Sequence, residues 1–220
     1  MILIPVKNLS TAKQRLAGIL DQPARTLLAQ TMLHDVLAAL AGWTQRPICA
    51  LVTGDAFAID LARQFNCEII PDRTNLGETA AIEMATRHCV SRGLESTLVI
   101  PADVPLIQAE EVAQIFSDAP AEGSVLAPAA DGRGTNAAFR RPADLFLLRF
   151  GNDSFQPHLV AARATGKPCT ILHLPGIALD VDHPADLLTL LARPGETRTQ
   201  SLLRQWSRDG RLPTAGMEGA

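Results

Sequence analysis

Short apolar runs alternate with longer amphipathic segments along most of the chain. Residues 2–6 and 97–100 are nearly continuous in aliphatic residues, which is typical of strands buried on both faces. Residues 23–40 instead carry Leu, Met and Val at helical spacing, and Asp21 and Pro23 suit the start of that helix. The same patterns predict further strands at residues 48–52, 68–70, 125–127, 137–139, 170–173 and 178–181, and further helices at residues 55–65, 79–90, 110–116 and 185–191.

This alternation predicts an α/β fold, with a Rossmann-like, mainly parallel sheet flanked by helices. The irregular stretch 128–142 interrupts the rhythm, and we expect it to carry a small antiparallel excursion beside the site. We expect one domain over residues 1–192. Residues 193–220 are more polar and predict a C-terminal tail, with one or two helical turns at residues 201–207.

Composition narrows the possible partners. The chain has 220 residues, 47% of them hydrophobic, with a net charge of −3 and no basic run, so a nucleic-acid surface is not expected. No apolar run reaches the length of a membrane span, and the first seven residues lack the basic start of a signal peptide. We therefore expect a cytoplasmic protein without a membrane partner. The four cysteines form no CxxC pair and predict structural thiols.

Carboxylates follow two of the predicted strands. Asp103 comes after the strand at 97–100, and Asp180 and Asp182 end the strand predicted at 178–181, where residues i and i+2 would share one face. Ligands of α/β sheets gather at the carboxyl ends of strands, where such carboxylates could hold a divalent cation and, through it, phosphates. The alternative is that each Asp only caps the helix that follows it.

The loop after the first strand is basic. It carries Lys7, Lys13 and Arg15 in the position where an α/β fold often receives phosphates. Neither a GxGxxG nor a GxxxxGK[ST] motif is present, so these side chains would have to neutralise phosphate charge themselves. Solvated surface residues are the alternative reading.

Four segments, in order, resemble the CofC/FbiD family of guanylyltransferases over about residues 1–192. They are Pro5-Val-Lys7 with Ala12-Lys-Gln-Arg-Leu16, Asp131-Gly-Arg-Gly-Thr-Asn-Ala137, Phe150-Gly-Asn-Asp-Ser-Phe155 with His158, and Leu179-Asp-Val-Asp-His-Pro-Ala-Asp-Leu187. The resemblance implies a GT-A-like nucleotidyltransferase of coenzyme F-420 biosynthesis. Such an enzyme joins GMP from GTP to 2-phospho-L-lactate, phosphoenolpyruvate or 3-phospho-D-glycerate and releases pyrophosphate.

The resemblance also implies roles for individual residues. Asp103 would bind Mg²⁺ with Asp182 and, second, Asp180. The catalytic residues would be Lys13, Arg15 and Asp103; the nucleotide-binding residues Pro5, Lys7, Lys13, Gly77, Glu78 and Thr79; and the acid-binding residues Thr135, Asn136, Gly151 and Ser154. The stretch 75–80 departs from the usual Gly-Leu-Asn-Ala of the family. Glu78 could accept from a guanine N–H edge or only favour the start of a helix.

The chemistry of this transfer needs no general base. The attacking group is the phosphate of the acid, which is largely dianionic at neutral pH because its second pKa is about 6. Three alternatives stay open: a molybdopterin or sugar-phosphate nucleotidyltransferase, a GT-A glycosyltransferase that uses Asp180-Val-Asp182, and a non-catalytic nucleotide-binding protein. A homodimer is also possible. His158 could touch the site, and Arg133 and Arg140 could meet the acid or be solvated.

Overall fold

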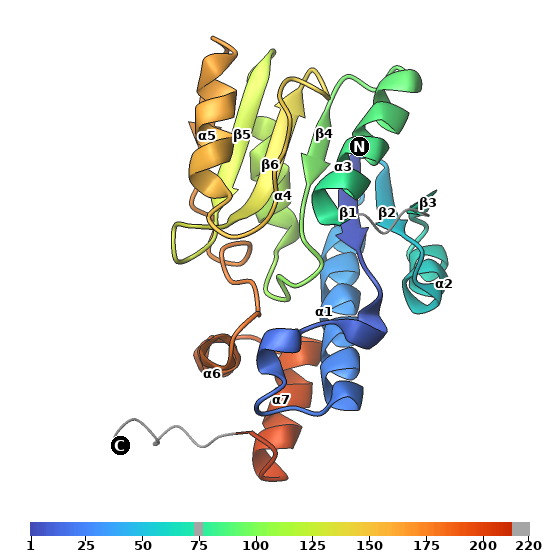
Figure 1. Cartoon of the computed structure of the whole chain (residues 1–220), viewed down its shortest axis with the longest axis vertical. Coiled ribbons are helices and arrows are strands. Elements are labelled where there is room, and N and C mark those ends of the chain that lie inside the picture. The colour runs from blue at the N-terminus through green and yellow to red at the C-terminus, as the bar shows by residue number, and fades with distance from the viewer. Residues whose placement is uncertain (73–76, 213–220) are drawn as a thin grey trace.

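A seven-stranded sheet forms the centre of the molecule in the computed structural model, which describes residues 1–72 and 77–212. Its strand order is β3-β2-β1-β4-β6-β5-β7, and only β6 runs against its neighbours (Figure 1). The predicted mainly parallel sheet with a small antiparallel part is therefore confirmed. The strands are β1 (Ile2–Val6), β2 (Cys49–Thr53), β3 (Glu68–Pro71), β4 (Thr97–Val99), β5 (Gly123–Pro128), β6 (Thr135–Arg141) and β7 (Cys169–Ile171).

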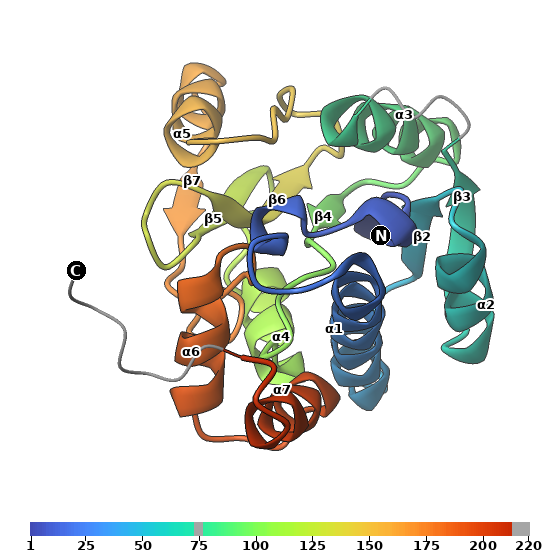
Figure 2. The ribbon, with the colours of Figure 1, turned by 60° about the horizontal axis from the view of Figure 1, so that its bottom comes forward.

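Helices cover both faces of this sheet. Figure 2 shows α1 (Gln22–Gly42), α2 (Ala56–Gln64) and α4 (Ala109–Ser117) on one side, and α3 (Glu78–Ser91) and α5 (Phe155–Ala164) on the other. Side chains of β1 alternate between the two layers: Ile2 and Ile4 pack on the α1 side, and Leu3 packs on the α3 side. Burial on both faces explains why the strand sequence is continuously apolar.

Two aspartate side chains cap helices and fix the ends of the connecting loops. The Asp21 carboxylate accepts from the Ala24 amide at 2.9 Å, and the Asp55 carboxylate accepts from the Ala58 amide at 3.0 Å. Asp55 also accepts from the Leu9 amide at 2.9 Å, so the cap of α2 holds the loop that follows β1. That loop continues through two 3₁₀ turns, η1 (Leu9–Thr11) and η2 (Gln14–Leu16).

The region after residue 192 contains a longer helix than expected. After α6 (Pro184–Ala192), α7 (Arg198–Arg208) packs against α1 through the buried side chains of Leu203 and Trp206 (Figure 1). The α1 carboxylate of Asp35 accepts from the backbone amides of Arg198 and Thr199 at 3.0 and 2.8 Å. The division of the chain at residue 192 stays a prediction.

The strand predicted at residues 178–181 is absent; the segment is an irregular turn. Its backbone groups do not bond in a strand ladder: the Val181 amide donates to the Asp103 carbonyl at 3.1 Å, and the Asn136 side chain donates to the carbonyls of Ala178 and of the preceding Ile177. Tertiary contacts therefore replace strand pairing. The i, i+2 argument for Asp180 and Asp182 sharing a strand face was wrong.

Two further findings bear on the sequence predictions. All four cysteines are free thiols, as expected from their spacing. Within residues 1–72 and 77–212, no helix is both long and apolar enough to cross a bilayer.

Candidate active site

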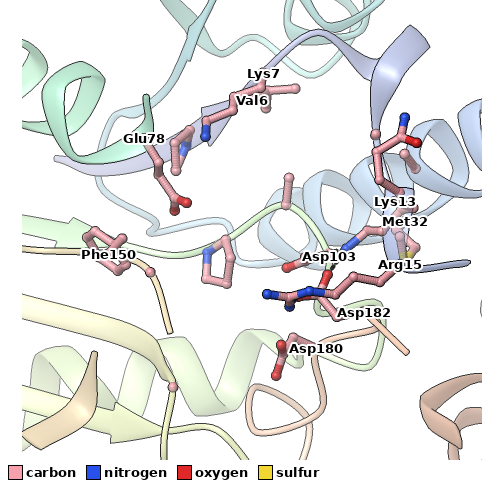
Figure 3. Close-up of a pocket in the computed structure, with 18 of the residues that line it drawn as sticks. Val6, Lys7, Lys13, Arg15, Met32, Glu78, Asp103, Phe150, Asp180 and Asp182 are labelled. Atoms are coloured by element: carbon pink, nitrogen blue, oxygen red, sulfur yellow. Dashed lines mark hydrogen bonds and ion pairs between the residues drawn. The ribbon is translucent and has the colours of Figure 1, made fainter. Parts of the chain in front are cut away.

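A cleft of about 540 Å³ opens at the carboxyl ends of β1 and β4 (Figure 3). The strand that follows β1 along the chain lies on one flank of β1, whereas the strands that follow β4 lie on the other flank of β4, so the strand order reverses here, and α/β folds bind ligands at such a switch point. The loop after β1 forms one wall, and Asp103 follows β4. Because β6 is antiparallel, its first residues, Thr135 and Asn136, lie at this same edge of the sheet.

A nearly buried ammonium group joins two acidic segments of the cleft. Lys13 Nζ lies 2.5 Å from Asp103 Oδ2 and 2.9 Å from Asp182 Oδ1, and only 8% of its side chain is exposed. Its backbone adopts the left-handed conformation, with φ of 55°, which directs the loop back over the cleft. Burial would lower the pKa of Lys13, but the two carboxylates outweigh it and raise that pKa.

Two further side chains contact the carboxylates of the cleft: Arg15 bonds to Asp182, and Asn136 bonds to Asp180. Arg15 bonds to Asp182 Oδ2 at 2.8 Å and to Asn152 Oδ1 at 2.9 Å. Burial favours protonation of Asp182, but Lys13 and Arg15 overcome it and lower the pKa of that carboxyl. Asn136 Nδ2 donates to Asp180 Oδ1 at 2.9 Å. The pKa of Asp180 is raised, mainly by burial and also by the neighbouring Asp103 and Asp182 charges.

The far end of the cleft is lined by Glu78 and Lys7 (Figure 3). Burial raises the pKa of Glu78 to about 7, helped by the negative charge of Asp103 and opposed by Lys7. Glu78 is the first residue of α3, directly after Gly77, whose φ of 106° suits glycine. Thr79 turns away and accepts from the Phe150 amide at 3.0 Å.

Four residues from β6 and the turn before α5 form a pocket wall that we call the acid cradle: Thr135, Asn136, Gly151 and Ser154. Ser154 Oγ accepts from the Thr135 amide at 3.0 Å, which joins the two segments. Gly151 has a φ of 143°, which favours glycine, and the absence of a side chain leaves its backbone open to the cleft. A second hollow of about 380 Å³ lies beside the cradle and shares Arg15, Asn152 and both Asp180 and Asp182 with the main cleft.

Most of the residues singled out in the sequence come together here. Gly77 and Thr79 do not line the cleft. Arg133 pairs with Asp153, and Arg140, expected at the acid or in solvent, is fully buried and donates to the Phe146 carbonyl. The predicted residues that line the cleft are Pro5, Lys7, Lys13, Arg15, Glu78, Asp103, Thr135, Asn136, Gly151, Ser154, Asp180 and Asp182.

Sequence reasoning gave no role of their own to Asn152 and Phe150, which also line the cleft. Asn152 lies in the Phe150–Phe155 turn that the resemblance had already singled out, so its position between Gly151 and Ser154 was the available signal. Its bond to Arg15 joins residues 137 positions apart, and no local pattern announces such a contact.

The donor atoms fit a hard divalent cation. Asp103 Oδ1 is buried and, within the described residues, has no hydrogen-bond partner, so it is available to a cation. No three His, Cys, Asp or Glu side chains in the described part of the chain are grouped closely enough to hold a metal by themselves. Mg²⁺ commonly takes one or two carboxylates and completes its coordination with substrate phosphates and water. The residues present therefore fit a cation bound together with a phosphorylated ligand.

Comparison with known families decides between the nucleotide-binding alternatives. The family model described as guanylyl transferase CofC like matches residues 1–212. The chain belongs to this family. Its members are guanylyltransferases, and the match extends through α7, beyond the region in which the four motifs occur.

Relatives of this CofC-like chain carry different acid names. A phosphoenolpyruvate guanylyltransferase of Sphaerobacter thermophilus is 36% identical and covers 84% of this chain and 89% of its own. A 3-phospho-D-glycerate guanylyltransferase of Colwellia psychrerythraea is 31% identical, with 88% and 92% covered. A 2-phospho-L-lactate guanylyltransferase of Methanothermobacter thermautotrophicus is 30% identical, with 92% and 89% covered.

A solved structure supports the fold. A candidate nucleotide-diphospho-sugar transferase from Desulfovibrio desulfuricans matches with a TM-score of 0.76 and 21% identity, covering 94% of each chain. At that identity, the likeness concerns the arrangement of strands and helices, which is that of nucleotidyltransferase-type folds.

Proposed function

We propose that this protein transfers GMP from GTP to the phosphate of a three-carbon phosphorylated acid and releases pyrophosphate. The acceptor is 2-phospho-L-lactate, phosphoenolpyruvate or 3-phospho-D-glycerate, the three acids in the names of its relatives. This reaction would belong to the biosynthesis of coenzyme F-420. The observation that carries the proposal is the Lys13 ammonium held between Asp103 and Asp182 at the switch point of the sheet.

The basic residues act on the triphosphate. Lys13 and Arg15 supply positive charge where negative charge grows as pyrophosphate leaves the α-phosphorus, and Lys7 lines the same cleft. The carboxylates that hold Lys13 and Arg15 also fix their positions before substrate arrives, so little reorganisation is needed during transfer. Positioning two anions against each other is the main task of this site.

Asp103, with Asp182 and Asp180, would hold Mg²⁺ together with the phosphates of the substrates, since these carboxylates are not grouped closely enough to hold it by themselves. When bound, this cation would neutralise phosphate charge and act as a template for the two substrates. The acceptor phosphate attacks without a general base, because it is already largely dianionic near pH 7. The role of the carboxylates is therefore to bind, and none of them has to remove a proton.

The acid occupies the acid cradle. Thr135 and Ser154 offer hydroxyl groups, and Gly151 lets backbone approach an anion closely. The Asn136 amide donates to Asp180 and to the carbonyls of Ile177 and Ala178, so it holds the cradle against that segment. Asp180 contacts Asn136 of the cradle and Asp182 contacts Lys13, so these two carboxylates link the cradle to the phosphate-binding residues. This arrangement aims the acceptor phosphate at the α-phosphorus of GTP.

At the far end of the cleft, Glu78 accepts from the N–H groups of guanine. A carboxylate suits the two adjacent donors on that edge, and adenine offers no such pair. The half-buried position of Glu78, with Lys7 nearby, leaves its carboxyl facing the cleft (Figure 3). Gly77 and Thr79 support Glu78 by fixing the start of α3 and its contact with Phe150.

The test is pyrophosphate release from GTP and Mg²⁺ with each of the three acids, compared with the same mixture without acid. Release that depends on one acid supports the reaction and identifies its acceptor. Replacing GTP by ATP or CTP should reduce release if Glu78 reads guanine. Bound GTP without release for any acid would instead favour a non-catalytic nucleotide-binding protein.

A further inference from the structure

A buried histidine, His158 on α5, lies directly behind the acid cradle and does not line the cleft. It is 1% exposed, and its ring meets Phe150 edge-on with centroids 5.0 Å apart. Nδ1 lies 2.9 Å from Thr135 Oγ1, and Nε2 lies 2.7 Å from the backbone nitrogen of Arg149. One ring therefore connects the start of β6 to the turn that carries Gly151.

The second of these contacts fixes the tautomer. The Arg149 amide can only donate, so Nε2 must be an unprotonated acceptor. A neutral imidazole then carries its proton on Nδ1 and donates it to Thr135 Oγ1. Burial, together with the charge of Arg140, lowers the pKa of His158 to about 4, so the ring is neutral at pH 7.

This tautomer determines that the Thr135 hydroxyl of the cradle keeps its own proton available for donation. Because Thr135 Oγ1 accepts from His158, its own proton must point elsewhere. Ser154 Oγ likewise accepts from the Thr135 amide and keeps its proton for another partner. Within residues 1–72 and 77–212, neither hydroxyl donates to a protein acceptor, although both side chains are about 95% buried and line the cleft.

We propose that His158 is a positioning residue for the acid: by donating to Thr135, it presets the Thr135 hydroxyl as a hydrogen-bond donor to an anionic group of that substrate. This inference rests on the proposed function of the cradle. Donors that are oriented before binding stabilise an anion without reorganising, and a partly desolvated wall strengthens each bond. The anionic group is either the carboxylate or the phosphate of the acid, because the Thr135 hydroxyl can donate a hydrogen bond to an oxygen of either.

Two substitutions separate the contacts of the ring. His158→Asn keeps an amide nitrogen near the Nδ1 position, facing Thr135, and loses the acceptor for Arg149. His158→Gln places its amide near the Nε2 position and loses the donor to Thr135. We expect His158→Gln and Thr135→Val each to raise the KM for the acid about tenfold. His158→Asn should keep the KM for the acid much closer to that of the wild type. The KM for GTP should stay unchanged in all three variants.

The double variant decides whether His158 acts through Thr135. Adding His158→Gln to Thr135→Val should raise the KM for the acid no further, because the hydroxyl that His158 orients is already gone. Additive losses, or a parallel rise in the KM for GTP, would mean that His158 only supports the fold, and the inference would fail.

A measurement without substrates tests the tautomer separately. Long-range ¹H–¹⁵N correlation spectra of the labelled protein at pH 7 should show His158 as the neutral Nδ1–H form, assigned by the loss of its signal in His158→Gln. An Nε2–H tautomer or an imidazolium would overturn the inference even in an active enzyme. If the wild type uses none of the three acids, the proposed function and the acid-binding role fail together, whereas this spectrum still reports the Thr135 contact.

Discussion

At the scale of single residues, Asp103 has two oxygen atoms with different tasks. Oδ2 pairs with Lys13, whereas Oδ1 is buried and has no hydrogen-bond partner in the described part of the chain, which leaves it available to a cation. We expect Asp103→Asn to lower GMP transfer by about 100-fold or more, because one charge of the phosphate-binding arrangement is lost. Lys13 keeps Asp182 as a partner, so the free energy of unfolding should fall by only about 1 kcal/mol. A loss of that size lowers the unfolding temperature by a few degrees.

Pyrophosphate release and thermal unfolding would be measured side by side on the same preparations. Asp60→Asn is the matched control, since Asp60 pairs with Arg63 on the exposed surface of α2 and lies in neither hollow of the site. It should leave both quantities unchanged. Near-normal transfer by Asp103→Asn with Mg²⁺ would show that the metal assignment is wrong.

A second prediction at the residue scale concerns Glu78 and the pH dependence of the free energy of unfolding. Its pKa of about 7, against a usual 4.5, means that the folded state holds this proton more tightly than the unfolded state does. The resulting stabilisation is complete below about pH 4.5 and is lost as pH rises through 7. Glu78→Gln has no carboxyl group to titrate at this position. We compare its free energy of unfolding with that of the wild type, both without nucleotide or metal. The difference, variant minus wild type, should increase by about 1–3 kcal/mol when the pH is raised from 4.5 to 8.

Denaturant unfolding at the two pH values measures this difference directly. Glu110→Gln, an exposed position in the first turn of α4, provides the control and should show no such change. Parallel pH dependences of Glu78→Gln and the wild type would show that the carboxyl is not held protonated by its burial.

At the scale of elements, α7 supports the site from behind. Leu203 and Trp206 belong to the same buried cluster as Leu16, Met32 and Val181, which adjoin or line the cleft near Lys13, Arg15 and the two carboxylates of residues 180 and 182. We expect Trp206→Ala to cost about 3–5 kcal/mol of stability and also to raise the KM for GTP, because the segments that carry the charged groups lose their support.

Ile115→Ala on α4 is the comparison for this helix. Ile115 is fully buried on α4, none of whose residues lines either hollow, so the substitution should lower stability by about 2–5 kcal/mol with little effect on the KM for GTP. Unfolding curves and steady-state kinetics well below the transition would separate the two effects. An unchanged KM in Trp206→Ala would confine α7 to a purely structural role.

At the scale of the whole molecule, local signals predicted the sheet and most of the cleft. The bounds of β1 and the caps at Asp21 and Asp55 depend on neighbouring residues, which a sequence displays directly. The bond from Asn136 to Asp180 and the contact of Asp35 with Thr199 join residues 44 and 164 positions apart. Hydrophobic periodicity does not encode such partners, so it misassigned residues 178–181 as a strand and left α7 in a polar tail.

The arrangement of the sheet predicts a division between its two halves, in which one half binds GTP and the other binds the acid. The parallel half, β3-β2-β1-β4, carries the loop after β1, the start of α3 and Asp103, whereas β6 and the turn before α5 carry the acid cradle. In hydrogen-exchange mass spectrometry, GTP with Mg²⁺ should therefore slow exchange mainly in residues 5–16, 77–82 and 101–104. A non-reactive analogue of the acid, added to that complex, should extend protection to residues 131–136 and 149–155.

Residues 178–183 lie between the two halves and should respond to both additions, because Asp180 contacts Asn136 of the cradle and Asp182 contacts Lys13. Slowed exchange here arises from fewer local openings once both ligands join the segment to its neighbours. Residues 56–64 of α2, which line neither hollow, serve as the internal control. Protection of the cradle by GTP alone would contradict this division and would place the nucleotide across both halves of the sheet.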